Sequence, residues 1–296
     1  MSNQVCIHGK MFSLYDNALS QPASRNAFFY LAEKVFGLHL QKWYDTGLDT
    51  EKYVPLLLTD NDLPVSNVSF SILEFDFRGE KKLFAQIGTV MSHPDYRNIG
   101  LNSFLMHTAL EKTKNLDGTF LFSNAECVGY YKKFGFVPGS EFHTRNIPVS
   151  HLKPAFRLAD INSPYDLEAL RHAYSAGNPY SLLKIKNNFG LVLFHLRSGQ
   201  FSFYLGNNDE TAVITRTNDS LLRLSAVYGK YCGNLKDICS ALPDTSPTAF
   251  STDFTPIDQS LPLCPSSDNN SVLMLLKGYL YPMRSSKCAF PLLSVT

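Results

Sequence analysis

Hydrophobic positions along the chain follow two periodicities, and this predicts a mixed α and β fold. Apolar residues at 101, 104, 105, 109 and 110 share one face at helical spacing, so a helix is expected over 101–114. Apolar runs that suit buried strands lie on either side of it, over 83–91 and 120–122. The other elements expected in this half are strands over 4–15, 53–58, 65–77, 136–137 and 143–149, and helices over 24–36, 38–44 and 130–134.

A similar order of elements recurs beyond Lys153-Pro154, where we expect a boundary. A helix is expected over 164–176, with Ser163 as its N-cap, and a second helix over 182–187. The pattern then predicts strands over 156–159, 191–196, 201–205, 211–215, 221–227, 249–252 and 272–276, and a helix over 234–242. Because 296 residues exceed one typical core, two domains are predicted, residues 1–150 and 151–296.

Composition and charge argue against several classes of protein. The 27 Lys and Arg nearly balance the 26 Asp and Glu, so nothing favours a nucleic-acid partner. The sequence shows no secretory signal and no run near the ~20 apolar residues of a membrane span, so we expect a cytoplasmic protein without membrane contact. The six cysteines form no C-x-x-C pair, which argues against a structural zinc, and no metal is expected.

The most informative stretch runs from Tyr96 to Met106, between the strand over 83–91 and the helix over 101–114. A strand, a short basic turn, a glycine and a helix together present free backbone N–H groups and the positive end of a helix dipole, which favours phosphate binding. The residues match neither a P-loop nor a three-glycine dinucleotide fingerprint. The alternative is a plain β-turn-α junction with a solvent-facing Arg97.

Two motifs resemble the GNAT superfamily of acyl-CoA-dependent N-acyltransferases. The first is Arg97-Asn98-Ile99-Gly100-Leu101-Asn102, which follows the R-x-x-G loop of that family, with Asn102 in place of the usual glycine or alanine. The second lies in 124–136 and matches the family's pattern at Tyr130, Tyr131, Gly135 and Phe136. The tandem arrangement is distantly similar to the enhanced-intracellular-survival acetyltransferases.

The resemblance implies an α+β architecture: a GNAT fold, with a mixed and mostly antiparallel splayed sheet flanked by helices, followed by a second, degenerate GNAT-like domain. In the family the fourth and fifth strands part. The exposed backbone of the fourth strand then pairs with the pantetheine arm of coenzyme A, and the loop amides hold its pyrophosphate. Coenzyme contacts are therefore expected from Val90, Met91, Ser92, Arg97, Asn98, Ile99, Gly100, Leu101, Asn102 and Asn124.

The resemblance also implies a reaction. A primary amine of a small molecule or peptide attacks the acyl carbonyl of acetyl-CoA directly, and Tyr131 donates a proton to the leaving thiolate as general acid. The alternative for Tyr131 is a core aromatic residue whose hydroxyl contacts solvent. The acidic and amide residues on or near the expected cleft strands are Glu74, Asp76, Gln86 and Glu126, and none of them is assigned as the general base.

We thus expect an N-acetyltransferase that uses acetyl-CoA as cosubstrate. A non-catalytic acyl-CoA-binding or sensory module is the alternative, because such a module would keep the loop without productive acceptor binding. The second half has no R-x-x-G motif at the matching junction, where the sequence runs from Gly229 to Asn234. We expect this half to pack against the first and to form a wall of the acceptor pocket. The sequence leaves a homo-oligomer open.

Overall fold

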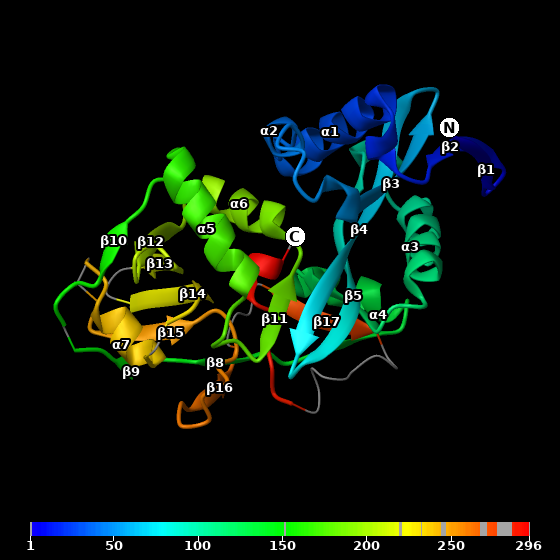
Figure 1. Ribbon diagram of the computed structural model, residues 1–296. Helices are drawn as coiled ribbons and strands as arrows, with labels where there is room; N and C mark the ends of the chain where they lie inside the picture. Colours follow the sequence, from blue (N-terminus) through cyan, green and yellow to red (C-terminus); the bar gives the residue numbers. More distant parts are fainter. Residues whose placement is uncertain are drawn as a thin grey trace.

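The chain folds into two large β-sheets with helices between them (Figure 1). The computed structural model describes residues 2–150, 152–218, 221–231, 233–243, 247–266, 271–276 and 286–295. One sheet has nine strands, the other has six, and a two-stranded ribbon is separate from both. The expected α+β class is confirmed.

The nine-stranded sheet holds the consecutive strands of the first half. Its members are β1 (Asn3–Ile7), β2 (Lys10–Tyr15), β3 (Tyr53–Asp60), β4 (Leu63–Phe77), β5 (Glu80–Ser92), β6 (Gly118–Ser123), β7 (Phe136–Pro138), β11 (Leu183–Lys186) and β17 (Val272–Leu276). The order is β1-β2-β3-β4-β5-β6-β17-β7, with β11 paired to β4. β5 and β6 run parallel, and the neighbours on either side of them are antiparallel.

Two strands of this sheet come from the second half of the chain. β11 pairs with the end of β4 that β3 does not reach, and places Leu183 opposite Phe77. β17 lies between β6 and β7, with Leu273 opposite Phe122 and Leu275 opposite Val137. The strand that joins β6 to β7 in the sheet therefore comes from near the end of the sequence.

The six-stranded sheet is built mainly from the second half. It contains β9 (Ile147–Pro148), β10 (Phe156–Leu158), β12 (Ser202–Gly206), β13 (Thr211–Asn218), β14 (Leu221–Gly229) and β15 (Ala249–Thr252), in the order β10-β12-β13-β14-β15-β9. The ribbon pairs β8 (Phe142–Thr144) with β16 (Leu263–Pro265). Because β9 belongs to the first half, strands are exchanged in both directions. The division at residue 150 stays a prediction.

Helices cover both faces of the nine-stranded sheet. The α-helices are α1 (Pro22–Phe36), α2 (Gln41–Tyr44), α3 (Leu101–Thr113), α4 (Val128–Lys132), α5 (Pro164–Ala176), α6 (Phe189–Arg197) and α7 (Leu235–Ser240). Short 3-10 turns are η1 (Ala18–Ser20), η2 (Thr50–Lys52), η3 (Pro94–Tyr96), η4 (Ala125–Cys127) and η5 (Leu292–Ser294). Figure 1 shows α5 and α6 between the two sheets and α3 on the far side of the nine-stranded sheet. No helix in the described part of the chain is long and apolar enough to cross a membrane.

The largest apolar cluster joins the two sheets through α5 and α6. It includes Phe84 and Phe120 from the nine-stranded sheet and Phe203 and Ile214 from the six-stranded sheet. Phe290, from the last described segment, stacks on Phe120 with ring centroids 3.7 Å apart. Phe290 therefore packs in the same core as residues of the nine-stranded sheet. This contact joins the two halves of the chain.

Local signals explain several element boundaries. α5 begins after Ser163, whose hydroxyl accepts a hydrogen bond from the Asp166 amide at 3.3 Å, and this confirms the predicted N-cap. α1 ends at Gly37, which has a φ of 68°, a conformation that glycine adopts without strain. The helix expected over 24–36, for which Ser24 is a plausible N-cap by sequence, instead begins at Pro22, and the Ser24 hydroxyl donates to the Ala18 carbonyl.

Two elements differ in type from the prediction. Residues 182–187, expected to be a helix, contain the strand β11, in which Leu183 and Ile185 are buried and the lysines between and after them are half-buried. Residues 191–196, expected to be a strand, belong to α6. A short apolar run has the same appearance in a buried strand and a buried helix, so its length and periodicity do not decide between them.

Candidate active site

β5 parts from β6 partway along its length. The parallel ladder covers residues 84–87 of β5 and 118–121 of β6. Beyond it, β5 continues to pair with β4 on its other edge as far as Ser92. In the part of the chain that the structure describes, Val90, Met91 and Ser92 therefore have no β6 residue opposite them. An open strand edge of this kind can pair with an extended ligand.

A β-bulge shapes β5 where the two strands part. The β4 register shifts between Asn67 and Ser69, and Thr89 has a φ of 48°, which a β-branched residue rarely adopts. Asn67 Nδ2 donates to the Thr89 carbonyl oxygen at 2.8 Å, and Tyr53 Oη lies 2.6 Å from Thr89 Oγ1. Burial raises the pKa of Tyr53 to about 12, so its phenol stays neutral and holds the bulge by hydrogen bonding.

The loop after β5 places two positive-φ residues before α3. Asn98 has a φ of 62° and Gly100 a φ of 83°, and α3 begins at the next residue. Arg97, Asn98 and Ile99 are exposed, whereas Leu101 is buried beneath the loop. The first amides of α3 have no carbonyl partner within the helix, so they are available to an anion at this end.

Asn102, which departs from the family pattern, points toward the sheet. Its side-chain oxygen accepts a hydrogen bond from the Ser66 hydroxyl at 2.5 Å, and Ser66 is fully buried in β4. A larger residue at this position is therefore accommodated by a partner in the sheet, and the loop itself keeps its open backbone conformation.

Asn124 and Tyr131 follow β6. Asn124 is exposed at the end of that strand and precedes η4, and Tyr131 lies in α4 with 9% of its surface exposed. Tyr131 belongs to the same apolar cluster as Ile87, Leu101 and Leu121, and Val90 packs against that cluster. The structure thus places Leu101 and Tyr131 in one apolar cluster, with Val90 packed against it. Met91 packs in a different cluster, beneath α1.

Burial determines the protonation state of Tyr131. Desolvation raises the pKa of its phenol above the usual value, and the neighbouring Cys127 and Tyr130 add to the shift. The Tyr130 ring packs edge-on against Tyr131, with centroids 5.2 Å apart. The phenol therefore carries its proton at neutral pH.

The four residues considered as a base are engaged or lie elsewhere. Glu74 forms an ion pair with Lys81 at 2.8 Å, and Asp76 accepts a hydrogen bond from the Gly79 amide in the turn after β4. Gln86 is buried and Glu126 is exposed in η4. A pocket beside the bulge is lined by Thr89 and Trp43, among other residues. None of the four acidic or amide residues lines it, so none is assigned as the base.

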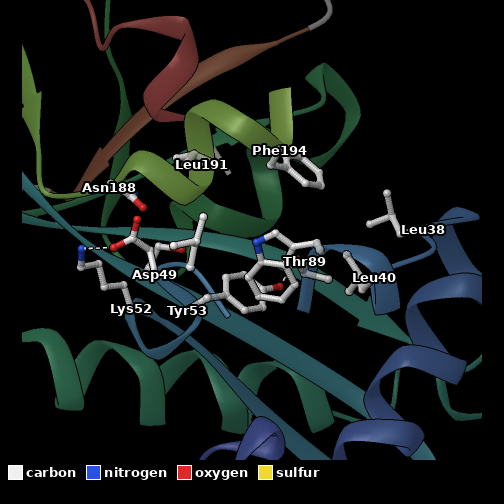
Figure 2. A pocket seen from close by; sticks show the side chains of 12 residues that line it. Leu38, Leu40, Asp49, Lys52, Tyr53, Thr89, Asn188, Leu191 and Phe194 are labelled. Atoms are coloured by element: carbon white, nitrogen blue, oxygen red, sulfur yellow. Dashed lines mark hydrogen bonds and ion pairs between the residues drawn. The ribbon is translucent and has the colours of Figure 1, made fainter. Parts of the chain in front are cut away.

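A pocket lies beside the bulge, and Thr89 is part of its lining (Figure 2). Its walls come from the segment between α1 and β3, from the bulged strands and from α6. The described lining residues are Leu38, Leu40, Trp43, Leu48, Asp49, Lys52, Tyr53, Ser71, Thr89, Asn188, Leu191 and Phe194. Figure 2 shows Leu191 and Phe194 on α6 facing Tyr53 and Thr89, with Leu38 and Leu40 toward one end. The pocket is therefore largely apolar and aromatic.

One end of this pocket carries charge. Asp49 forms an ion pair with Lys52 and accepts a hydrogen bond from the Gly190 amide at 2.7 Å. The contact to Gly190 joins the first half of the chain to the start of α6. Sequence reasoning missed these pocket residues, because Asp49 and Gly190 meet only after folding. The aromatic residues around Trp43 were the one available hint. Among the described residues, no group of His, Cys, Asp and Glu side chains is arranged to hold a metal ion.

Known structures share this fold over most of the chain. A conserved protein of unknown function from Enterococcus faecalis V583, described as a probable N-acyltransferase, matches with a TM-score of 0.60 at 13% identity, over 90% of this chain and 72% of that one. Eis1 from Mycobacterium abscessus matches with a TM-score of 0.57 at 11% identity, over 90% and 73%. A GCN5-related N-acetyltransferase from Anabaena variabilis matches with a TM-score of 0.56 at 14% identity, over 89% and 72%. Similarity at these identities establishes the fold.

Sequence comparison matches part of the chain to a family model. No curated protein matches the chain. Residues 11–139, which contain the parted strands, the loop before α3 and Tyr131, match the family model described as an acetyltransferase (GNAT) domain. This agrees with the resemblance carried by Arg97–Asn102 and by the residues around Tyr131. Residues 11–139 are therefore similar to the acetyltransferase domain of the GNAT family.

Proposed function

We propose that the protein is an N-acetyltransferase that transfers the acetyl group of acetyl-CoA to a primary amine on a small molecule or peptide. The observation that carries this proposal is the open edge of β5. Its pairing with β6 ends at Ile87, the bulge at Thr89 follows at once, and the strand leads directly into the loop before α3. A thioester carrier with a long arm and a diphosphate fits such a continuous open edge and helix start.

The residues at this edge suit the parts of coenzyme A. The backbone of Val90, Met91 and Ser92 would pair with the amides of the pantetheine arm. The amides from Asn98 to Asn102 would hold the pyrophosphate, with Arg97 exposed beside them and Asn124 across the opening. Gly100 supports the fit, because its φ of 83° aims the loop amides in a direction that other residues adopt only with strain.

The chemistry follows from the groups at the parted strands. The amide N–H of Val90 would donate to the acyl oxygen as negative charge develops on it. The amine nitrogen forms a bond to the acyl carbon, the carbon–sulfur bond breaks, and Tyr131 gives its proton to the departing sulfur. The proton lost by the amine passes to solvent. Burial of Tyr131 keeps the phenol protonated for this step.

The pocket beside Thr89 would bind the acceptor. It opens on the side of the bulge away from α3, so an amine there could approach the acyl group from the face opposite the coenzyme. Its apolar walls, Trp43 and Phe194 among them, favour an amine attached to an apolar group. At one end, Asp49 and Lys52 form an ion pair, so this end would offer polar groups to the acceptor without a net charge.

We further propose that residues 151–296 form a second, degenerate GNAT-like domain. Two observations support it: the recurrence of strand-helix order around a second sheet, and structural matches that extend over about 90% of the chain. Its contribution to the site would be α6, which supplies Leu191 and Phe194 to the pocket.

The test is acyl transfer with Tyr131→Phe. Purified protein is mixed with acetyl-CoA and a panel of aromatic and aliphatic primary amines, and free thiol is measured. The wild type should release thiol with a subset of amines, and Tyr131→Phe should lower kcat by about 10²-fold, because the leaving thiolate loses its proton donor. The KM for acetyl-CoA should stay close to that of the wild type.

Tyr130→Phe is the matched control, because it removes a phenol one residue away in the same helix. It should retain most of the wild-type kcat. Acetyl-CoA binding without thiol release on any amine would instead support the non-catalytic module. Equal activity of the two Phe variants would contradict the role given to Tyr131.

A further inference from the structure

A second cavity lies between the six-stranded sheet and the end of the chain. It measures about 500 Å³, within the usual range for small-molecule sites. One wall comes from the segment 141–146 and from β13, β14 and the residues after β15. The other wall includes Phe122, Phe290 and Leu292. It shares no described lining residue with the pocket beside Thr89.

An arginine pair faces this cavity. Arg216 on β13 and Arg223 on β14 are directly opposite each other in the antiparallel register, so both side chains lie on one face of the sheet. Like charges in this position repel each other unless a counter-charge is supplied. Asp253, only 2% exposed, lies between them and supplies it.

The hydrogen bonds around Asp253 leave part of each guanidinium for a ligand. Arg216 donates from Nε and Nη2 at 3.0 and 3.1 Å, and Arg223 donates from the same two atoms at 2.9 and 2.6 Å. Ser225 donates to the same carboxylate at 2.8 Å. Among the described residues, neither Nη1 group has a hydrogen bond, and the two arginine side chains remain 33% and 31% exposed.

Two guanidinium groups of the described lining share the single carboxylate of Asp253. Arg145 adds a third guanidinium, and the carboxylates are those of Asp253 and Glu141. Although burial opposes it, Arg216 and Arg223 hold the pKa of Asp253 below its usual value, so its charge is present at neutral pH. Glu141 also accepts a hydrogen bond from the Phe290 amide at 3.0 Å, which ties it to the chain.

A neutral histidine completes the polar wall. His143 lines the cavity, is 9% exposed, and its Nδ1 has no hydrogen-bond partner within the described structure. Burial lowers its pKa to about 4, with the nearby arginines adding to the shift and Asp253 opposing it. It therefore does not add a charge at pH 7, but an unsatisfied buried polar atom remains beside the arginines.

We infer that this cavity binds a small organic anion, with a carboxylate or phosphate held by Arg145, Arg216 and Arg223. Guanidinium groups form paired hydrogen bonds with both kinds of oxyanion. The opposite wall of Phe122, Phe290 and Leu292 would pack against an apolar part of the same molecule. The site is separate from the proposed transfer site and does not depend on acyl transfer.

The test is binding of simple probes to the full-length protein in low-salt buffer, measured by titration calorimetry. Phenyl phosphate carries a phosphate on a phenyl ring, and benzoate carries a carboxylate on the same kind of ring. Benzyl alcohol is the neutral control. We expect saturable binding of at least one anion with a Kd tighter than about 1 mM, and none of benzyl alcohol at that concentration. The stronger of the two anions identifies the preferred group.

Two variants place the site. Arg145→Gln removes one charge and leaves the bonds to Asp253 in place, and Arg223→Lys keeps the charge but removes the paired donor geometry. Each should weaken binding by about tenfold. Arg197→Gln, an exposed arginine at the end of α6 outside both pockets, should bind as the wild type does.

Three results would overturn the inference. They are the absence of saturable binding of both anions, equal binding of benzyl alcohol, and wild-type affinity in a folded Arg145→Gln protein. Circular dichroism establishes that each variant is folded. If Arg223→Lys does not fold, Arg145→Gln alone decides the question.

Discussion

At the residue scale, Gly100 combines two requirements of the loop before α3. Its φ of 83° lies in the left-handed region, and a Cβ atom added there would stand 2.8 Å from Nε2 of His8 in the β1–β2 turn. The histidine is exposed at the end of a flexible side chain, so it can move away. The backbone conformation cannot be relieved in that way.

Gly100→Ala should therefore weaken acetyl-CoA binding by about tenfold, because the strained φ turns the loop amides away from the pyrophosphate. The measurement is titration calorimetry with acetyl-CoA. The control is the double variant His8→Ala/Gly100→Ala. The His8→Ala change removes the steric contact with residue 100 but leaves its backbone strain. If affinity returns fully in the double variant, the contact with His8 and not the φ of Gly100 is the cause.

His143 should make stability depend on pH. Burial lowers its pKa to about 4 from an ordinary 6.5, so below pH 6.5 the unfolded chain takes up a proton that the folded protein does not. The free energy of unfolding should thus fall as the pH drops from 6.5 toward 4. This residue should account for about 2 kcal/mol between about pH 7.5 and about pH 5.

Urea unfolding at the two pH values checks this expectation. His143→Gln should lose less stability on acidification than the wild type, because it has no group that titrates there. His172→Gln, which changes an exposed histidine on α5, should follow the wild type. The same acid loss in His143→Gln as in the wild type would contradict the prediction.

At the element scale, α6 is held against the segment before β3 by a close backbone approach. A Cβ atom on Gly190 would lie 2.4 Å from the Leu48 carbonyl oxygen, and the Gly190 amide donates to Asp49. No side chain fits in this space. The first turn of α6 therefore positions Leu191 and Phe194 over the pocket only if residue 190 is a glycine.

Gly190→Ala should lower the free energy of unfolding by about 1–3 kcal/mol, as overpacking of a tight contact does, and should raise the KM for the amine more than that for acetyl-CoA. Thermal unfolding and steady-state kinetics measure the two effects. Gly129→Ala, with open space around a helical glycine, is the control and should leave stability unchanged or higher. A Gly190→Ala protein as stable as the wild type would show that α6 can shift freely.

At the scale of the whole molecule, exchanged strands make the two halves interdependent. β17 fills the space between β6 and β7, and Phe290 stacks on Phe120 in the core of the nine-stranded sheet. β9, in return, pairs with β15 in the other sheet. Each sheet is therefore incomplete without residues from the other half of the chain.

A fragment of residues 1–150 should fail to fold cooperatively, because it exposes the β6 edge and the apolar surface that β17 and Phe290 cover. Thermal unfolding by circular dichroism should show no sharp transition for this fragment. The full chain should unfold in one transition. A stable 1–150 fragment that binds acetyl-CoA would contradict this expectation and would show that the first half folds by itself.

Local features of the fold were predictable from the sequence because their causes are local. The glycine before α3, the cap at Ser163 and the bounds of β15 and β17 all follow from residues within a few positions of one another. The family motifs likewise led to the proposal of Arg97–Asn102 and Tyr131 as site residues, since each motif lies within one strand-to-helix segment. The family model that matches residues 11–139 spans both motifs.

The rest was decided by tertiary structure, because the partners are far apart in the sequence. Leu183–Lys186 is a strand because the edge of β4 accepts it, and 191–196 is helical in the space between two sheets. The pocket beside Thr89 exists only where Asp49 meets Gly190, and the arginine pair gains its buried counter-charge only where the residues after β15 place Asp253 between the two side chains. Hydrophobic patterning determines which residues are buried, but the backbone pairing that selects their neighbours depends on the assembled sheet.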